Sequence, residues 1–239
     1  MSPTEIVIAS LVMMVGASVQ GSVGFGMGML TAPLLLLIDP ILVPGPVLMA
    51  ALVLTLLVAH RERRTIDLGS VGWAVVGRLP GAVIGAAILA IVSQRTVAIL
   101  VGAVVLLAVA MLAAGVRTRR TRGTLMTAGL VSGLTGTLAS VGGPPIAMLY
   151  HDATGARIRG TLSGFFIIGL VMSLSALALL GGLGTRHLIA AAGLIPGVVI
   201  GFVISTHLAP IIDRGQTRRA VLGTSALGGV VVVARALMM

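Results

Sequence analysis

Two glycine-rich segments and one isolated arginine are the residues of this sequence whose types and spacing suggest chemistry. The first segment covers 21–28 and the second covers 140–145, where two glycines are followed by two prolines. Glycine costs about 1 kcal/mol and proline about 3 kcal/mol in a helix interior, so both helices should break there. Free backbone N–H groups at half-helix N-termini bind anions, aided by the helix dipole, and glycine lets a ligand approach closely. The two segments therefore predict an anion-binding site.

The predicted substrate-binding residues belong to these segments or flank them, and Arg78 joins them from another helix. They are Gln20, Gly21, Ser22, Gly24, Gly26, Gly28, Thr31, Arg78, Gly136, Thr137, Ser140, Gly142, Gly143 and Pro144, with Ser132 as a further side-chain donor. The alternative is that the glycines are helix-packing positions of the small-xxx-small kind. We expect packing to be the role of the pairs Gly81/Gly85 and Gly197/Gly201.

Arg78 is the one arginine that lies outside the predicted loops. It follows ten residues after Leu68, the start of an apolar segment. At 1.5 Å per residue this places it about 15 Å deep, near the centre of a bilayer. A charge at that depth costs at least about 2.5–3.5 kcal/mol. Three interpretations stay open: Arg78 attracts the anion, it pairs with backbone carbonyls freed by Pro80, or it reaches the interface along a shallower helix.

Few other residues suggest chemistry. His151 and Asp152 follow the second segment and are weak candidates for carrying a coupling proton. The sequence contains no catalytic Ser/His/Asp set and no H-E-x-x-H motif, so we expect neither an enzyme nor a metal site. The glycine run at 24–28 lacks the βαβ context of a dinucleotide site, and we expect no cofactor.

Composition determines where such a site can reside. Of the 239 residues, 57% are hydrophobic and only 9% are charged, with a mean hydropathy of +1.16. An ordinary soluble domain carries about 25% charged residues, so the outer surface of this chain must face lipid. The net charge is +10, but the sixteen basic residues are all arginines in short clusters between apolar runs. That layout is typical of cytoplasmic loops beside anionic lipid and argues against nucleic-acid binding.

A spanning helix needs about 20 apolar residues. The predicted full spans are 41–59, 68–92, 97–115, 161–180, 187–206 and 219–237. The regions 4–38 and 124–150 contain the glycine-rich segments and do not fit this template. Each region either crosses the membrane or re-enters as a hairpin.

The arginines favour hairpins. Two hairpins place 12 loop arginines on one side and three on the other, whereas two crossings give nine against six. Because positive residues favour the cytoplasmic side, the larger asymmetry is expected. Both termini then lie outside the cytoplasm, in a cell inner membrane that the chain crosses several times.

An internal repeat divides the chain. Residues 77–85 align with 193–201 at an offset of 116, and the two glycine-rich regions align at an offset of 112. We expect a first transmembrane repeat at 1–115, an arginine-rich cytoplasmic linker at 116–123 and a second repeat at 124–239. The predicted fold is an all-α polytopic membrane protein of two inverted repeats. Each repeat has a broken or re-entrant hairpin plus three transmembrane helices, about eight membrane segments in total.

The paired glycine-rich segments, the later Pro-Gly-x-x-Ile-Gly motif in each half and the length together resemble the TauE/SafE family of membrane transporters. The resemblance covers essentially the whole chain. It implies export of sulfite, sulfonates or related organosulfur anions, and it carries the family's glycine-rich segments onto 24–28 and 142–145. This sequence reads Gly-Phe-Gly-Met-Gly in the first of them, where many relatives have a denser run of glycines.

The predicted function is therefore secondary transport of a small anionic substrate across the cytoplasmic membrane. The alternatives are a transporter of the same fold for a non-sulfur solute, and an anion channel or membrane partner subunit. Membrane lipid is the expected partner. Glycine pairs such as Gly181-Gly182 and Gly228-Gly229 are suited to a homodimer contact or to internal packing.

Overall fold

The structure is a computed structural model that describes residues 1–115, 118–150, 153–212, 230 and 234. Within this part of the chain all regular structure is helical. Its α-helices are α1 (Pro3–Val23), α2 (Met27–Ile38), α3 (Gly45–Arg61), α4 (Leu68–Ile91), α5 (Gln94–Ala113), α6 (Arg122–Ala139), α7 (Gly143–Ala147), α8 (Gly155–Leu179) and α9 (Thr185–Ile212). Short 3-10 turns follow α2, α3 and α7, at Pro40–Leu42, Arg63–Thr65 and Met148–Tyr150.

Side-chain caps fix where several helices begin. Ser2 accepts a hydrogen bond from the Glu5 backbone N–H while Glu5 accepts one from Ser2, which forms a capping box at α1. Thr121 and Thr124 form the same reciprocal pair at α6. Single caps by Ser93 and Thr154 begin α5 and α8. These caps satisfy N–H groups that a helix start otherwise leaves unpaired.

Five helices of the described chain are long and apolar enough to span a membrane: Pro3–Val23, Leu68–Ile91, Gln94–Ala113, Gly155–Leu179 and Thr185–Ile211. Four of them match predicted spans. The fifth, α1, was predicted as part of a broken region, and the structure shows that it is long enough to cross alone. The predicted span 41–59 corresponds to α3, which has only 17 residues. The predicted span 219–237 lies outside the described residues except for Val230 and Ala234.

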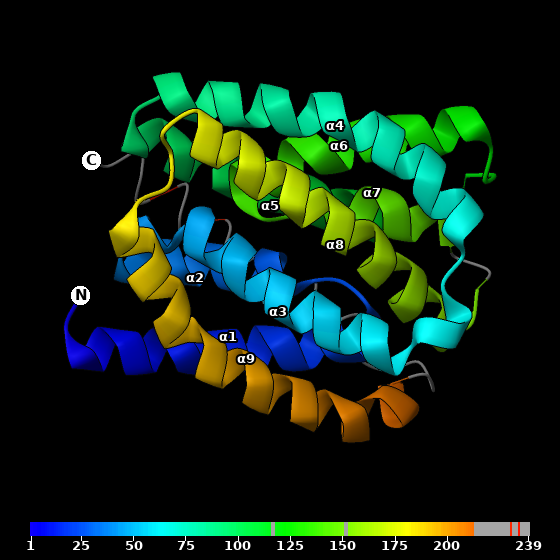
Figure 1. The fold of residues 1–239 in the computed structure, drawn as a ribbon, viewed down its shortest axis with the longest axis horizontal. Coiled ribbons are helices and arrows are strands. Elements are labelled where there is room, and N and C mark those ends of the chain that lie inside the picture. The colour runs from blue at the N-terminus through cyan, green and yellow to red at the C-terminus, as the bar shows by residue number, and fades with distance from the viewer. Residues whose placement is uncertain (116–117, 151–152, 213–229, 231–233, 235–239) are drawn as a thin grey trace.

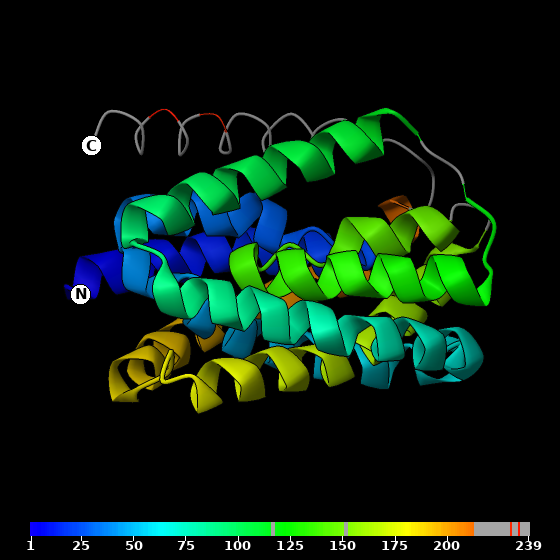
Figure 2. The ribbon, with the colours of Figure 1, turned by 90° about the horizontal axis from the view of Figure 1, so that it is seen from above.

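The long helices run side by side, and the chain reverses at each break (Figures 1 and 2). From its start α1 runs toward the opposite end of the bundle, and α2 returns toward that start. Ile6 of α1 and Leu36 of α2 accordingly lie beside the same pocket. In the opposite direction, α6 runs toward the end where α1 begins, and the chain turns back into α7 (Figure 2). We call the end where α1 begins the N-terminal end.

Most of the described arginines lie at the opposite end, which we call the arginine-rich end. Arg95 and Arg186 lie at the N-terminal end, at the starts of α5 and α9. The arginine-rich end carries Arg61, Arg63, Arg64, Arg119, Arg120, Arg122, Arg157 and Arg159.

Glycines let two pairs of parallel helices approach at backbone distance. α4 lies along α6, where a side chain at Gly81 would overlap the Leu130 carbonyl oxygen. α9 lies along α1, where a side chain at Gly197 would overlap the Ser10 carbonyl oxygen. Gly85 and Gly201 lie one turn further along the same contacts, against Thr137 and Met14. The predicted packing role of these four glycines is confirmed. Between the two pairs, α3 and α8 pack against each other.

Candidate functional site

The first break lies between α1 and α2. Gly24 and Gly26 have φ angles of +99° and +111°, which side-chain-bearing residues rarely adopt. The N–H of Gly24 donates to the Gln20 carbonyl oxygen at 2.7 Å and ends α1. The Gln20 side chain then reaches across the break, where its Oε1 accepts from the Met27 N–H at 3.3 Å. The break therefore occupies only 24–26, inside the predicted segment 21–28.

The second break lies between α6 and α7. Ser140 has a φ of +59° and is the single non-glycine residue of the described chain with a positive φ. Two side chains of α6 bind the carbonyls that the break frees: Ser132 Oγ donates to Gly142 O at 2.5 Å, and Thr135 Oγ1 donates to Val141 O at 2.7 Å. A carbonyl freed inside an apolar protein needs such a partner.

The two breaks touch. A side chain at Gly28 would overlap the Ser140 carbonyl oxygen, and a Cβ at Gly143 would lie 2.6 Å from the Cβ of Phe25. Glycine at these positions is therefore required by close approach rather than by backbone conformation. The segments that the sequence places more than 100 residues apart meet at one point in the fold.

Arg78 of α4 lies at this meeting point and is 1% exposed. Its Nη1 donates to Ser132 Oγ at 2.8 Å and approaches Ser132 O at 3.5 Å. Its guanidinium carbon lies 4.9 Å from the ring centre of Phe165 and 6.0 Å from that of Phe166, within cation–π range. The backbone carbonyl it contacts belongs to α6 and not to the turn that precedes Pro80. Its burial excludes the interpretation in which it reaches the interface.

Three glycines make room for this side chain. Added Cβ atoms at Gly136 and Gly142 would lie 3.1 Å from guanidinium nitrogens of Arg78, and one at Gly169 would overlap its Nε. These glycines come from α6, from the second break and from α8. The guanidinium therefore occupies a space that three separate elements leave empty.

The charge of Arg78 has no carboxylate partner among the described residues. The ion pairs of the described chain involve other arginines. Two buried polar atoms of the described side chains lack any hydrogen-bond partner, and they are Arg78 Nε and Ser140 Oγ. A buried charge is ordinarily paired, and a buried polar group is ordinarily hydrogen-bonded. A guanidinium whose Nε lacks a partner and a hydroxyl without a hydrogen bond, both at one point, can bind a small anion.

Both residues line a cavity of about 30 Å³. That volume is enough for one or two water molecules. Its other polar residue is Gln20, and Phe166 and Leu170 of α8 form part of its apolar wall. Nine of the fourteen predicted substrate-binding residues line it: Gln20, Gly26, Gly28, Arg78, Gly136, Ser140, Gly142, Gly143 and Pro144.

The other five predicted residues do not line this cavity. Gly21 packs against Ser205 of α9, and Gly24 packs against the backbone of Arg159. Ser22, Thr31 and Thr137 are buried and use their hydroxyls within the protein. The first two bond to carbonyls of their own helices, and Thr137 bonds to Ser173 of α8.

Sequence reasoning missed the contribution of α8. Phe165, Phe166 and Gly169 surround the guanidinium, although no glycine-rich break marks their helix. One signal was present: the chain has four phenylalanines, and two of them are adjacent here. Adjacent aromatic side chains in an apolar helix are suited to contact a buried cation.

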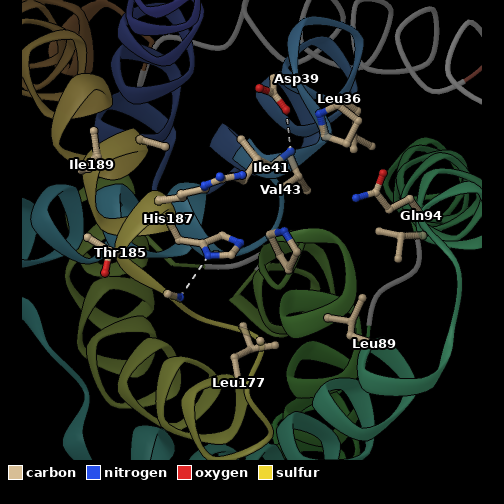
Figure 3. A pocket seen from close by; sticks show the side chains of 18 of the residues that line it. Leu36, Asp39, Ile41, Val43, Leu89, Gln94, Leu177, Thr185, His187 and Ile189 are labelled. Carbon is tan, nitrogen blue, oxygen red and sulfur yellow. Dashed lines mark hydrogen bonds between the residues drawn. The ribbon is translucent and has the colours of Figure 1, made fainter. Parts of the chain in front are cut away.

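A second, larger pocket of about 1100 Å³ opens at the N-terminal end (Figure 3). We call it the vestibule. In the view, Leu36, Gln94 and Leu89 line the right side, Thr185 and Ile189 line the left side, and Leu177 lies at the bottom. Asp39, Arg186 and His187 add charged or titratable groups. His187 Nδ1 accepts from the Gly184 N–H at 3.1 Å. The sequence patterns gave no indication of this pocket.

An ion pair joins the starts of α4 and α8 at the arginine-rich end. Asp67 Oδ2 lies 3.1 Å from Arg157 Nη2, and Asp67 Oδ1 accepts from the Ser70 N–H at the start of α4. Burial raises the pKa of the Asp67 carboxyl, but the hydrogen bonds from Ser70 and Arg157 outweigh it and hold the pKa below its ordinary value. Half of the Arg157 side chain is exposed.

The remaining predictions concern the coupling residues, the glycine pairs and the metal site. His151 and Asp152, the candidate coupling residues, lie outside the described residues, as do Gly228 and Gly229. Gly181 has a φ of +74° directly after α8, so it ends a helix and does not form a flat helix face. Where side chains are described, no three His, Cys, Asp or Glu residues lie together as a metal site would require.

Comparisons with known proteins give one match. No curated protein and no solved structure matches the chain. A family model described as "Sulfite exporter TauE/SafE" matches residues 8–232. The match includes both breaks, Arg78 and all of the helices that surround the small cavity. This chain belongs to the TauE/SafE family of membrane transporters.

Proposed function

We propose that this protein is a secondary transporter that exports a small anion, sulfite, a sulfonate or a related organosulfur anion, across the cytoplasmic membrane. One observation carries the proposal: a buried arginine with no carboxylate partner among the described residues lies where two broken helices meet. Family membership supports transport, and the buried charge supports an anionic substrate.

The unpaired charge has a physical consequence. Arg78 keeps one strong hydrogen bond to Ser132 and two aromatic contacts, which offset part of the cost of its burial. A bound anion supplies the missing negative charge and accepts hydrogen bonds from Arg78 Nε and Ser140 Oγ. A carboxylate side chain at the position of the anion would occupy the site permanently. A site with no such side chain among the described residues suits a ligand that must leave.

The architecture we infer is two inverted repeats, 1–115 and 124–239, joined by the linker 116–123. α1–α2 and α6–α7 run in opposite directions, as inverted copies must (Figures 1 and 2). Each broken helix packs along a helix of the other half, α1 along α9 and α6 along α4. The two hairpins are re-entrant in this proposal, and the chain has about eight membrane segments.

The arginine-rich end faces the cytoplasm in this proposal. Eight of the described arginines lie there against two at the N-terminal end. Positive residues near membrane helices favour the cytoplasmic side. The N-terminus is then outside the cytoplasm, the C-terminus is assigned outside as well, and the membrane is the cell inner membrane.

The two ends support alternating access. The vestibule opens at the N-terminal end, whereas the small cavity beside Arg78 holds no more than about two waters. A substrate leaving from this form moves outward through the vestibule. A membrane potential of 100 mV drives an anion outward with about 2.3 kcal/mol per charge, which is enough for export without a nucleotide. The proton-motive force is the default alternative for coupling.

The test is flux of labelled sulfite in proteoliposomes under an imposed potential and pH gradient, with sulfate and methanesulfonate as comparators. We expect saturable flux and counterflow in the wild type. Arg78→Leu should lose at least about tenfold in flux, because a buried charge–anion contact contributes more than an exposed one. Arg78→Lys should keep part of it. Arg64→Leu, at an exposed position, is the matched control.

The outcomes separate the alternatives. Full anion flux in Arg78→Leu with normal folding would refute the role of Arg78. Flux that does not saturate and shows no counterflow indicates a channel. Flux of a neutral or cationic solute in place of the anions indicates a transporter of the same fold for another substrate, and no flux of any solute indicates a partner subunit.

A further inference from the structure

Two arginines and one glutamate meet at the arginine-rich end, just beyond the end of α1. Glu62 Oε1 accepts from Arg61 Nε at 3.1 Å and from Arg159 Nε at 3.0 Å. Arg61 ends α3, Glu62 follows it, and Arg159 lies in the first turns of α8. We call these three side chains the latch. None of them was singled out by the sequence patterns except as a topology signal.

The latch binds the end of the first broken helix. Arg61 Nη2 donates to the Gly21 carbonyl oxygen, and Arg159 Nη1 donates to the Ser22 carbonyl oxygen at 3.1 Å. The last carbonyls of a helix have no partner within it and attract cations. Arg61 Nη1 also donates to Ser205 Oγ of α9 at 3.1 Å. The latch therefore joins α1, α3, α8 and α9 at one end of the bundle.

The latch is partly shielded from water. The side chains of Arg61, Glu62 and Arg159 are 20%, 13% and 7% exposed. Charge pairs in such surroundings are screened less than surface pairs. Gly24, the first residue of the break, packs on the backbone of Arg159. The latch thus lies directly beside the break that borders the small cavity.

At the opposite end of the described chain, the repeat positions equivalent to the two latch arginines are apolar. At the repeat offset of 116, Arg61 corresponds to Leu177 and Arg159 corresponds to Val43. Both of these apolar residues line the vestibule. One end is therefore held by charged hydrogen bonds, and the equivalent positions at the other end border open space.

Glu62 is shared by both arginines of the latch. Its Oε1 accepts from two guanidinium groups in partly shielded surroundings. Arginine pairs are suited to bind carboxylate and other oxyanions through directed N–H groups. Glu62 is itself a tethered oxyanion, so the position of its carboxylate marks where a free oxyanion can bind.

We propose that Arg61 and Arg159 form a second anion-binding site, which Glu62 occupies in this closed form, and that a small oxyanion arriving from the arginine-rich end replaces Glu62 and opens that end. The replacement step rests on the anion transport proposed above. The closing role of Glu62 does not.

The test exploits the absence of cysteine from the sequence. Ala51 of α3 lines the small cavity, and Ala51→Cys introduces a thiol with little change in volume. A membrane-impermeant methanethiosulfonate reagent is applied from the arginine-rich side of oriented vesicles. With Glu62→Gln added, labelling should become about tenfold faster, because a shielded ion pair no longer holds the end closed.

Asp67→Asn is the matched control, since it removes the more exposed ion pair to Arg157 at the same end. Its labelling rate should stay within about twofold of the parent rate. Glu62→Asp keeps the charge with a shorter reach and should give an intermediate rate. It also keeps the test valid should Glu62→Gln fold poorly. Unchanged labelling in both Glu62 variants, or equal acceleration in Asp67→Asn, would overturn the closing role.

Anion replacement is tested with sodium sulfate against sodium chloride at equal ionic strength. In the Ala51→Cys parent, sulfate should accelerate labelling several-fold beyond chloride, and with Glu62→Gln added this extra acceleration should vanish. Equal effects of the two salts mean charge screening alone and would overturn the anion site. Labelling needs no transport. If the protein transports no anion but labelling is still faster in Glu62→Gln, the proposed function is refuted and the closing role of Glu62 stands.

Discussion

Thr137 and Ser140 lie three residues apart at the end of α6, yet their hydroxyls meet different surroundings. Thr137 Oγ1 shares a hydrogen bond of 2.8 Å with Ser173 of α8, and both side chains are fully buried. Ser140 Oγ is buried beside the small cavity and has no hydrogen-bond partner in the described part of the chain. The first hydroxyl stabilises the contact between two helices, and the second is free to bind a ligand.

This difference gives a prediction at the residue scale. Thr137→Val leaves the buried Ser173 hydroxyl without its partner and should lower the free energy of unfolding by about 1–3 kcal/mol. The half-saturating anion concentration should stay unchanged. Ser140→Ala should do the reverse, weakening anion binding several-fold with little loss of stability. Thermal unfolding in detergent and flux titrations measure the two effects. A Thr137→Val protein with wild-type stability and weakened binding would contradict this assignment.

Arg78 could be recognised from the sequence because a charge in the middle of an apolar segment is conspicuous. The direction of Thr137 could not, because residues three apart share a helix face only while the helix continues, and α6 ends before Ser140, which is left-handed. Which face meets the cavity depends on where α8 packs. Phe166 and Gly169 were missed for the same reason: their role appears only when a distant helix is placed beside them.

The glycine contacts act at the scale of elements. Gly81 of α4 allows backbone contact with Leu130 of α6, and Gly72 of the same helix has open space where a Cβ would be. The parallel contact positions Arg78 against Ser132, so helix packing and site geometry are linked.

Gly81→Ala should therefore destabilise the protein by about 1–3 kcal/mol through overpacking, and it should weaken anion binding by shifting Arg78. Gly72→Ala is the control on the same helix. It should leave stability unchanged or raise it, because alanine favours the helix by about 1 kcal/mol over glycine. Unfolding temperatures in detergent compare the two variants. Equal effects from both would show that helix propensity, and not the contact, decides the outcome.

The existence of both breaks was predictable from glycine and proline, but their exact positions were not. The sequence indicated 21–28, and the chain breaks only at Gly24–Gly26. Gly21 and Gly28 remain helical, and glycine is needed there for close contacts with Ser205 and with Ser140. Glycine has two uses in membrane helices, and single-sequence reasoning does not separate them.

At the scale of the molecule, the proposed repeats are interlocked. Each broken helix packs along a helix of the other half, so each half alone exposes glycine-lined backbone that nothing covers. Lipid tails cannot fill such a groove as well as a matching helix does. The repeat offset was visible in the sequence, but this exchange of partners was not, because pairing between halves leaves no local pattern.

A split protein tests the interlocking. Fragments 1–115 and 124–239 expressed separately should aggregate or be degraded, and co-expression should yield a complex that purifies together and transports. Co-purification through an affinity tag on one fragment measures the assembly. A first fragment that is monodisperse and stable alone would show that its broken helix does not depend on α9.

The contact between α1 and α9 also has a consequence for synthesis. α1 leaves the ribosome first, and its packing partner begins only at Thr185. Through most of translation the glycine-permitted face of α1 therefore lies in the bilayer without the helix that will cover it. The carbonyls of Gly21 and Ser22 beside the first break likewise lack their hydrogen-bond donors until Arg61 and Arg159 have been synthesised. The cavity beside Arg78 is thus completed late, when Phe166 and Leu170 of α8 have been synthesised.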